Sequence, residues 1–294
     1  MIAASAGAGQ EASSSPRKAE PADSEGEIAV RIATQDGLLP GRDLAEKAQH
    51  AREYGFEGIE LWGGGVPERV AEIRAAMGGA GLPVACICAG FGGSLLASDR
   101  KSRDQAIADI TRLLEAAGEL GAAGVIAVPI FGGPQFPDLR PWKGAVEVER
   151  EVLRAQLPQL GATAAKAGCH LLLEPLNRYE THFLKTLSDA APFCTPEAGN
   201  VAIMADFFHM SLEEGDMAAA VREHAGLIRH VHLADSNRQL PGHGHTDFLP
   251  GFRALATAGY GGWMSLECGV PGDPAVLLPR CAAHLHALVA QAKA

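Results

Sequence analysis

Residues 170–176 read HLLLEPL, an apolar run that carries a single glutamate near its end. The arrangement recurs at 201–209 (VAIMADFFH), 230–235 (HVHLAD) and 263–269 (WMSLECG). Each run resembles a buried strand, yet each holds, near its carboxyl end, a carboxylate or an imidazole that a packed core ordinarily excludes. The four polar residues are Glu174, Asp206, His232 and Glu267. Intervals of 32, 26 and 35 residues separate them (174 to 206, 206 to 232, 232 to 267), about one strand–helix unit each.

Short apolar runs alternate with longer amphipathic segments eight times along the chain. Eight strand–helix units are what a (β/α)8 TIM barrel requires, at roughly 250 residues. The sequence therefore predicts one α/β TIM-barrel domain over residues 28–294. A doubly wound open sheet is the alternative, but no G-x-G-x-x-G follows the first strand, and four polar strand ends suit a ring better. The expected strands are 28–34, 58–62, 84–89, 124–129, 170–175, 201–207, 229–234 and 263–268.

Local signals support these boundaries. Glycine closes a helix at little cost because it takes the left-handed conformation. Capping-box spacing places helix starts at Asp43 with Glu46 and at Ser211 with Glu214, and Asp273 before Pro274 begins the last helix. Seven glycines stand where helices should end: Gly55, Gly81, Gly121, Gly168, Gly199, Gly226 and Gly259.

Composition limits the function. The net charge of -10 leaves no basic surface, so the main source of nucleic-acid affinity is missing and such a partner is disfavoured. The chain has no run of 18 apolar residues, which predicts no membrane span. Residues 1–27 are rich in Ala, Ser, Gly, Glu and Pro and predict a disordered tail rather than a signal peptide. The six cysteines mostly lie inside apolar runs, as expected of a reduced, cytoplasmic protein.

The longest non-helical connection is 131–144, FGGPQFPDLRPWKG. It follows the fourth predicted strand, and long loops at the catalytic face of a barrel often cover the substrate. Phe136 and Trp142 are the candidates for its apolar lining. The alternative is that Trp142 packs on a neighbouring loop.

Strand alternation turns the four polar residues toward the barrel interior. His232 lies nearer the strand end than His230, which is expected to support it from one layer below. A single buried carboxylate is often satisfied by a helix cap or an arginine, but several together favour a divalent cation. One nitrogen with mostly carboxylate oxygens suits Mn²⁺, Mg²⁺ or Co²⁺. Glu174, Asp206, His232 and Glu267 are thus the predicted metal ligands.

Three companion motifs follow these ligands. EPLNRYE places Glu180 beyond the fifth strand, DFFHMSLEE places His209 three residues after Asp206, and HLADSNRQLPGHGHTDF places Arg238 beyond His232. An arginine fork there suits a substrate oxygen. The alternatives are surface salt bridges for Glu180 and Arg238 and a packed histidine for His209.

Together these motifs resemble the sugar isomerase/epimerase superfamily of xylose-isomerase-like TIM barrels, and most closely its ketose 3-epimerase branch. Motifs typical of the family are frequent between about residues 98 and 290. Before residue 98, only the segment GFEGIELW resembles the family. It implies one Mn²⁺, Mg²⁺ or Co²⁺ on the four ligands, with Mn²⁺ preferred, and a substrate carbonyl end bound by Glu180, His209 and Arg238. It also implies a dimer or tetramer.

The predicted reaction removes a proton beside a carbonyl of a sugar or keto-polyol through a metal-stabilised cis-enediolate. Glu174 and Glu267 are the candidate acid and base, and proton return from the opposite face inverts the carbon. Return from the same face would give aldose–ketose isomerisation. Loss of a leaving group would make the protein a lyase on a keto-sugar, keto-inositol or 3-keto-glycoside. Nuclease activity is disfavoured because only His50 precedes residue 170, and a non-catalytic sugar-binding barrel because both glutamates are present.

Overall fold

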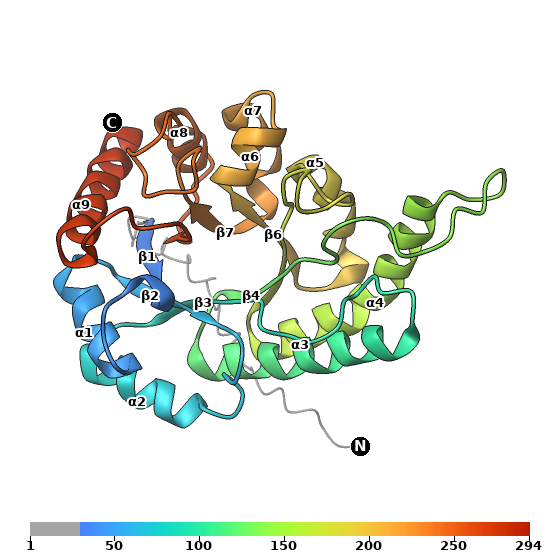
Figure 1. Cartoon of the computed structure of the whole chain (residues 1–294), viewed down its shortest axis with the longest axis horizontal. Helices are drawn as coiled ribbons and strands as arrows, with labels where there is room; N and C mark the ends of the chain where they lie inside the picture. The colour runs from blue at the N-terminus through green and yellow to red at the C-terminus, as the bar shows by residue number, and fades with distance from the viewer. Residues whose placement is uncertain (1–29) are drawn as a thin grey trace, which may run out of the picture.

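The computed structural model describes residues 30–294, where eight parallel strands close into a barrel in chain order. The last strand pairs with the first, through Ile32 opposite Met264, so no sheet edge is left open. Figure 1 shows the strands as a central ring inside the helices. The strands are β1 (Arg31–Gln35), β2 (Gly58–Trp62), β3 (Val84–Cys88), β4 (Gly124–Ala127), β5 (His170–Leu173), β6 (Val201–Asp206), β7 (Ile228–Leu233) and β8 (Trp263–Leu266).

The predicted TIM barrel is confirmed. The bounds of β2 are as expected, and those of the other strands differ by a few residues at their ends. The tail predicted for 1–27 and the strand start predicted at 28 lie outside the described residues.

Helices connect the strands and cover the outside of the ring (Figure 1). Within the described part of the chain, none is long and apolar enough to cross a membrane. They are α1 (Leu44–Glu53), α2 (Val70–Ala80), α3 (Arg100–Leu120), α4 (Ala145–Ala167), α5 (Leu187–Ala190), α6 (Phe207–Glu213), α7 (Met217–His224), α8 (Leu249–Thr257) and α9 (Pro274–Lys293). Short 3-10 turns are η1 (Asp36–Leu38), η2 (Ala191–Phe193), η3 (Pro196–Ala198) and η4 (Ala225–Leu227).

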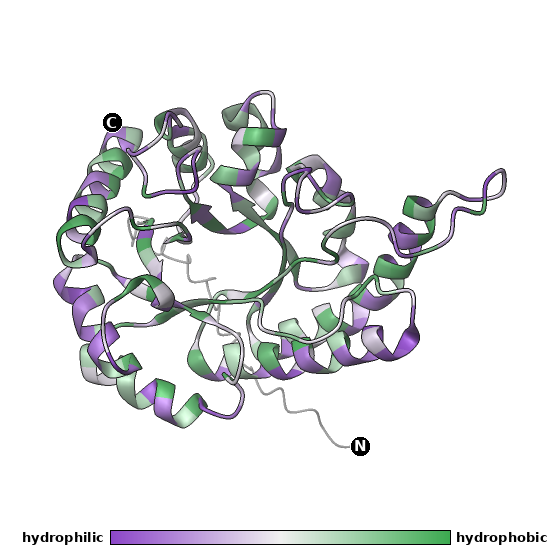
Figure 2. Ribbon diagram, in the orientation of Figure 1, coloured by the Kyte–Doolittle hydropathy of each residue, from purple (hydrophilic) through white to green (hydrophobic). Residues whose placement is uncertain are grey.

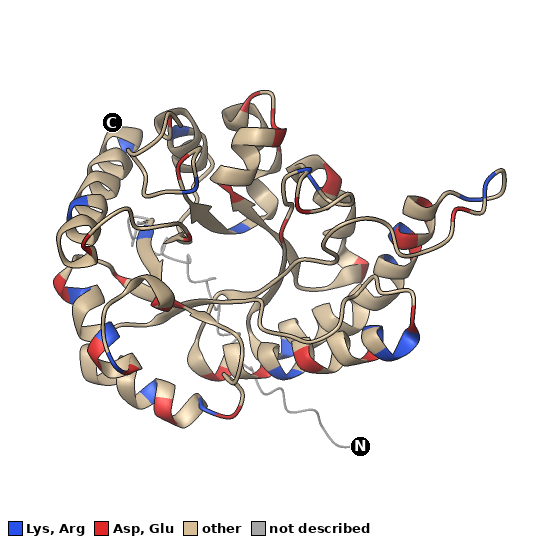
Figure 3. Ribbon diagram, in the orientation of Figure 1, with Lys and Arg blue, Asp and Glu red and all other residues tan. Residues whose placement is uncertain are grey.

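Hydrophobic packing follows the strand alternation. In β8, Met264 and Leu266 face outward into the core between strands and helices, whereas Ser265 is not part of that core. A separate interior cluster includes Cys86, Cys88 and Met204. The strands are the most continuously hydrophobic part of the ribbon (Figure 2), while charged residues lie mainly on helices and loops (Figure 3). Cys86 and Cys88, from the apolar run VACICAG (84–90), thus pack in the barrel interior.

Most predicted helix signals agree with the structure. Asp43 caps α1 by accepting the Glu46 N–H, and Asp273 caps α9. Gly81, Gly121 and Gly168 end α2, α3 and α4 in the left-handed conformation, and Gly55, Gly199 and Gly259 also have positive φ. Gly226 was predicted as a helix stop, and this is wrong, because it lies inside η4 and does not have a positive φ.

The capping box predicted at Ser211 and Glu214 is also wrong. Helix α6 starts directly at the end of β6, and Asp206 caps it by accepting the Phe208 N–H at 2.7 Å. Ser211 therefore lies within the helix and donates to the Phe208 carbonyl at 2.7 Å. A metal-ligand candidate thus also fixes the first turn after its strand, which holds that carboxylate in one orientation.

The connection predicted to cover the site does not do so. Residues 133–143 stand out beyond the ring of helices as an arm (Figure 1). Trp142, within this segment, is 73% exposed, and Phe136 lies under the Arg103 guanidinium, 5.7 Å from its ring centre. Glu149 anchors the base of the arm, because it accepts the Gln135 N–H and pairs with His182. The prediction that Phe136 and Trp142 line the substrate space is therefore wrong.

Candidate metal centre and active site

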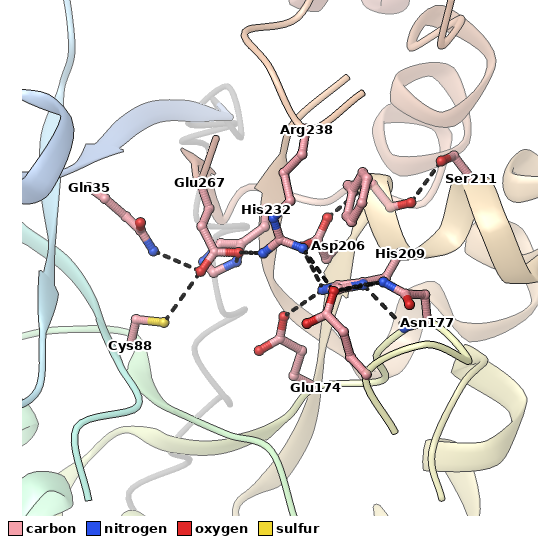
Figure 4. A network of polar contacts seen from close by, with 12 residues as sticks. Gln35, Cys88, Glu174, Asn177, Asp206, His209, Ser211, His232, Arg238 and Glu267 are labelled. Atoms are coloured by element: carbon pink, nitrogen blue, oxygen red, sulfur yellow. Dashed lines mark hydrogen bonds and ion pairs between the residues drawn. The ribbon is translucent and has the colours of Figure 1, made fainter. Parts of the chain in front are cut away.

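The four predicted ligands meet at the carboxyl ends of β5 to β8. Glu174 lies just beyond β5, Asp206 ends β6, His232 lies near the end of β7, and Glu267 lies just beyond β8. One ligand atom of each lies within 4.8 Å of those of the other three. All four side chains point into the same space in Figure 4.

Two atoms of this group have no hydrogen-bond partner although they are fully buried: Asp206 Oδ2 and His232 Nδ1. Buried polar atoms are rarely left unpaired, because the loss of hydration is not compensated. Three carboxylates and one imidazole also match the ligand set of Mn²⁺, Mg²⁺ or Co²⁺. The residues present therefore fit a divalent cation.

Glu60 in β2 is a functional candidate that the sequence prediction missed. Its side chain is fully buried and contacts both histidines of β7, with distances of 2.6 Å to His230 Nε2 and 2.8 Å to His232 Nε2. Gln35 donates to the same carboxylate at 2.9 Å and to Glu267 at 3.1 Å. Because Glu60 engages Nε2 of His232, the other ring nitrogen faces the centre, 3.4 Å from Glu267.

A signal for Glu60 was present in the sequence. The predicted strand 58–62 carries Glu60 at its middle, and a charged residue in the middle of a buried strand needs a partner. Alternation also places Trp62 on the same face as Glu60, toward the catalytic end. The expected supporting place of His230, one layer below His232, agrees with its contact to Glu60.

The surroundings shift the pKa values of Glu174 and Glu267 in opposite directions. Burial raises the pKa of Glu174 well above its usual value, and the neighbouring Glu267 and Asp206 carboxylates add to the rise. Burial acts to raise the pKa of Glu267 as well, but the positive charges of His232 and Arg238 outweigh this effect and lower the pKa to about 2. The protein alone thus makes one carboxyl easier to protonate than the other.

Arg238 has an unusual backbone. Its φ of 57° is in the left-handed region, which costs free energy for a residue other than glycine. Two backbone hydrogen bonds of 2.7 Å, to Asp235 and from Gly269, hold it there. The guanidinium then donates to Glu267 at 2.9 Å and lies over Phe208, 4.6 Å from its ring centre. This geometry fixes the arginine fork over the centre.

His209 presents one ring proton to the same space. The Asn177 backbone N–H donates to His209 Nδ1 at 3.1 Å, so in the neutral ring the proton is on Nε2. Burial lowers the pKa of His209, which favours this neutral form. Nε2 lies 3.2 Å from Arg238 Nη1, and two adjacent donors need an acceptor between them. Glu180, 3.5 Å from Arg238 Nη1, completes the group predicted to bind substrate.

A cavity of about 240 Å³ opens above the centre. Charged side chains line it where β5 to β8 end, and Glu174, Arg238 and Glu267 are among them. Trp62 and Phe131 line it where β2 and β4 end, and neither was predicted there. The cavity is therefore lined by the base of the 131–144 segment but not by its arm.

Residues 48–286 match the family model described as xylose isomerase-like TIM barrel. The chain belongs to this family. The family model covers most of the barrel and includes every candidate site residue named above except Gln35. The resemblance to this family stated from the sequence motifs is confirmed.

Its relatives in the family include named epimerases. The chain is 33% identical to the 3-dehydro-D-guloside 4-epimerase of Escherichia coli K12, over 84% of this chain and 95% of that protein. It is 30% identical to the L-ribulose 3-epimerase of Mesorhizobium japonicum, over 76% of this chain and 75% of that protein. The crystal structure of the apo 3-keto-D-glucoside 4-epimerase from E. coli superposes with a TM-score of 0.80 at 32% identity, covering 88% of this chain and 99% of that one.

Proposed function

We propose that this protein is a divalent-metal-dependent sugar epimerase that inverts a carbon next to a carbonyl group. The observation that carries the proposal is the convergence of Glu174 and Glu267 on one buried centre with the unpartnered Asp206 Oδ2 and His232 Nδ1. The epimerases among the relatives support the reaction class.

Glu174, Asp206, His232 and Glu267 would hold the cation, and Mn²⁺ is the ion we propose, with Mg²⁺ or Co²⁺ as substitutes. When bound, the cation would stabilise negative charge that develops on the substrate oxygens. Asp206 and His232 are held by α6 and by Glu60, so they act chiefly as ligands. We propose that the two glutamates, besides binding the cation, also transfer the proton.

Inversion needs a base on one face of the carbon and an acid on the other. Glu174 follows β5 and Glu267 follows β8. These two strands are separated by β6 and β7, so the two carboxylates approach the centre from different sides. We propose that one removes the proton and the other returns it. His209 Nε2 and Arg238 Nη1 would donate to the carbonyl-end oxygen, and Glu180 would accept from a neighbouring hydroxyl.

The names of the relatives suggest two substrate types, free ketoses and 3-keto-glycosides. The 3-keto-glycoside is the first candidate, because the relative with the larger shared length is named for such a compound. The six cysteines are unpaired, in keeping with the reducing cytoplasm where we propose that the enzyme acts. Assembly into a dimer or tetramer stays a prediction.

The proposal is tested with metal-stripped protein reloaded with Mn²⁺. Metal analysis should give one ion per chain, and NMR should detect an inverted product from a 3-keto-glycoside or a ketose. Asp206→Asn should lose the ion, while Asp216→Asn, which alters only the cap of α7, should keep it. Loss of water or of the aglycone in place of inversion would support the lyase alternative, and no change in any ligand that binds would refute the enzyme.

A further inference from the structure

The cavity has two chemically different walls. The charged side chains stand on one side, whereas the ends of β2, β3 and β4 present mostly apolar ones. The apolar wall comprises Trp62, Phe91, Val128, Ile130 and Phe131, with Leu176 added from the segment after β5. The polar side chains beside this wall are Ser94, whose hydroxyl already donates to the Pro129 carbonyl at 2.8 Å, and Cys88.

An unsubstituted keto-hexose fits this division poorly. It carries a hydroxyl on nearly every carbon, and those turned toward the apolar wall would lose water without gaining a partner. Sites that recognise small polar ligands place polar groups around them. A ligand that is polar at one end and presents an apolar face or ring at the other matches both walls.

Trp62 is built into the wall rather than carried on a loose loop. It is the last residue of β2 and pairs with Cys88 in β3, and the following Gly63 N–H donates to the Cys88 carbonyl at 3.0 Å. A Cβ on Gly63 would lie 2.1 Å from the Ala89 carbonyl, and one on Gly90 would lie 2.3 Å from Gly64 N. This close approach needs glycine and leaves a rigid base under an indole that is 62% exposed.

Phe131 has a similar base on the other side of the wall. Its neighbours are both tied to the segment after β5: Thr181 donates to the Ile130 carbonyl at 2.8 Å, and the Gly132 N–H donates to the Glu180 carbonyl at 2.7 Å. The phenyl ring is nevertheless 62% exposed. Two exposed aromatic rings on fixed backbone, both lining one cavity, are a platform for ring stacking.

We infer that the Trp62 and Phe131 rings form a subsite for the aglycone of a glycoside substrate, a second sugar ring or an aromatic group, while the keto-sugar ring occupies the charged wall. This inference rests on the proposed function for the identity of the keto-sugar. The inference concerns the aglycone, which is the part of the substrate that the reaction does not change. Binding energy from such a remote group also orients the reacting carbon.

The test compares methyl and phenyl 3-keto-β-D-glucosides with the Mn²⁺-loaded enzyme. Trp62→Ala and Phe131→Ala should each raise KM for the phenyl glycoside by about tenfold, as expected for loss of an aromatic contact. KM for the methyl glycoside should change less than about twofold by the same reasoning. Trp142→Ala is the matched control, since this exposed tryptophan lies on the arm outside the cavity, and it should alter neither value.

Calorimetry with the unreactive phenyl and methyl β-D-glucosides separates this inference from the proposed function. Preferential binding of the phenyl compound, lost in Trp62→Ala, would support the subsite even if no substrate is turned over. Equal effects of Trp62→Ala on both compounds, or equal binding of both by the unaltered protein, would overturn the subsite and leave the epimerase proposal standing.

Discussion

Strands β5 to β8 end in carboxylates, a histidine and an arginine-bearing loop, whereas β2 to β4 end in aromatic, small and thiol side chains. Strands β5 to β8 carry the residues proposed to hold a cation and to move a proton. Strands β2 to β4 shape the cavity and give it an apolar surface, and β2 also carries the buried Glu60, which contacts His232. A single ring thus carries the reacting groups on one side and an apolar binding surface on the other, so variants on the two sides should fail in different ways.

The largest effect is expected from Glu267→Gln. It removes the carboxylate proposed to transfer the proton but keeps the side-chain shape, so proton exchange on the substrate should fall about 1,000-fold or more. Deuterium incorporation followed by NMR measures this, with thermal unfolding as the check on folding. Glu213→Gln is the control, because Glu213 pairs with Arg178 away from the centre. Exchange within tenfold of the unaltered enzyme would exclude Glu267 as acid or base.

Arg238→Lys should reduce kcat/KM by roughly 100-fold. Lysine keeps the charge but loses the fork that contacts Glu267 and faces the substrate space. Steady-state kinetics tests this, and Arg178→Lys, which alters an outward pair with Glu213, should leave kcat/KM nearly unchanged. If both substitutions have the same effect, Arg238 does not bind substrate.

Glu60→Gln should weaken metal binding by about 10- to 100-fold, the usual cost of losing a partner that orients a metal-bound histidine. Isothermal titration with Mn²⁺ measures this without reference to activity. Glu149→Gln is a closely matched control, since Glu149 is also fully buried and also pairs with a histidine, His182, but at the arm. Unchanged affinity in Glu60→Gln would remove β2 from the support of the centre.

The smallest effect concerns stability. Asp235 accepts the backbone N–H groups of Ser236, Gly242 and Thr246, and Asp235→Asn should cost about 1–3 kcal/mol of unfolding free energy. Burial acts to raise the pKa of Asp235, but these donors outweigh it and lower the pKa to about 2.

A folded-state pKa below the unfolded value stabilises the protein above about pH 4, and this contribution is lost as the pH falls toward 2. Urea unfolding should therefore show a gap in unfolding free energy between Asp235→Asn and the unaltered protein that is widest at pH 7 and becomes smaller as the pH falls through 3 toward 2. A gap that does not depend on pH would contradict the hydrogen-bonding role.

The sequence was enough to predict which residues converge where one residue stood out locally. Glu174, Asp206, His232 and Glu267 interrupt apolar runs at regular intervals, and closure of the barrel alone was enough to bring them together. The sequence was not enough where the outcome depended on contacts between distant segments. The role of Glu60 depends on His230 and His232, which lie 170 and 172 positions later in the chain. No local sequence feature distinguished Phe131, which lines the cavity, from Phe136, which does not.

Helix starts show the same limit on a smaller scale. Ser211 and Glu214 have the spacing of a capping box, yet α6 begins earlier because Asp206 already caps it from the strand end. A local motif predicted the correct kind of element and the wrong starting residue. Competition between two nearby caps is decided by how β6 ends, which the motif does not contain.

The most direct test of the central claim is the conversion of a 3-keto-glycoside by the Mn²⁺-loaded enzyme in D₂O. Transfer between two glutamates on opposite faces predicts one solvent deuterium at the inverted carbon of the product and none at carbons away from the carbonyl. An inverted product without deuterium, formed while the glutamates exchange freely with solvent, would contradict proton removal and return by Glu174 and Glu267.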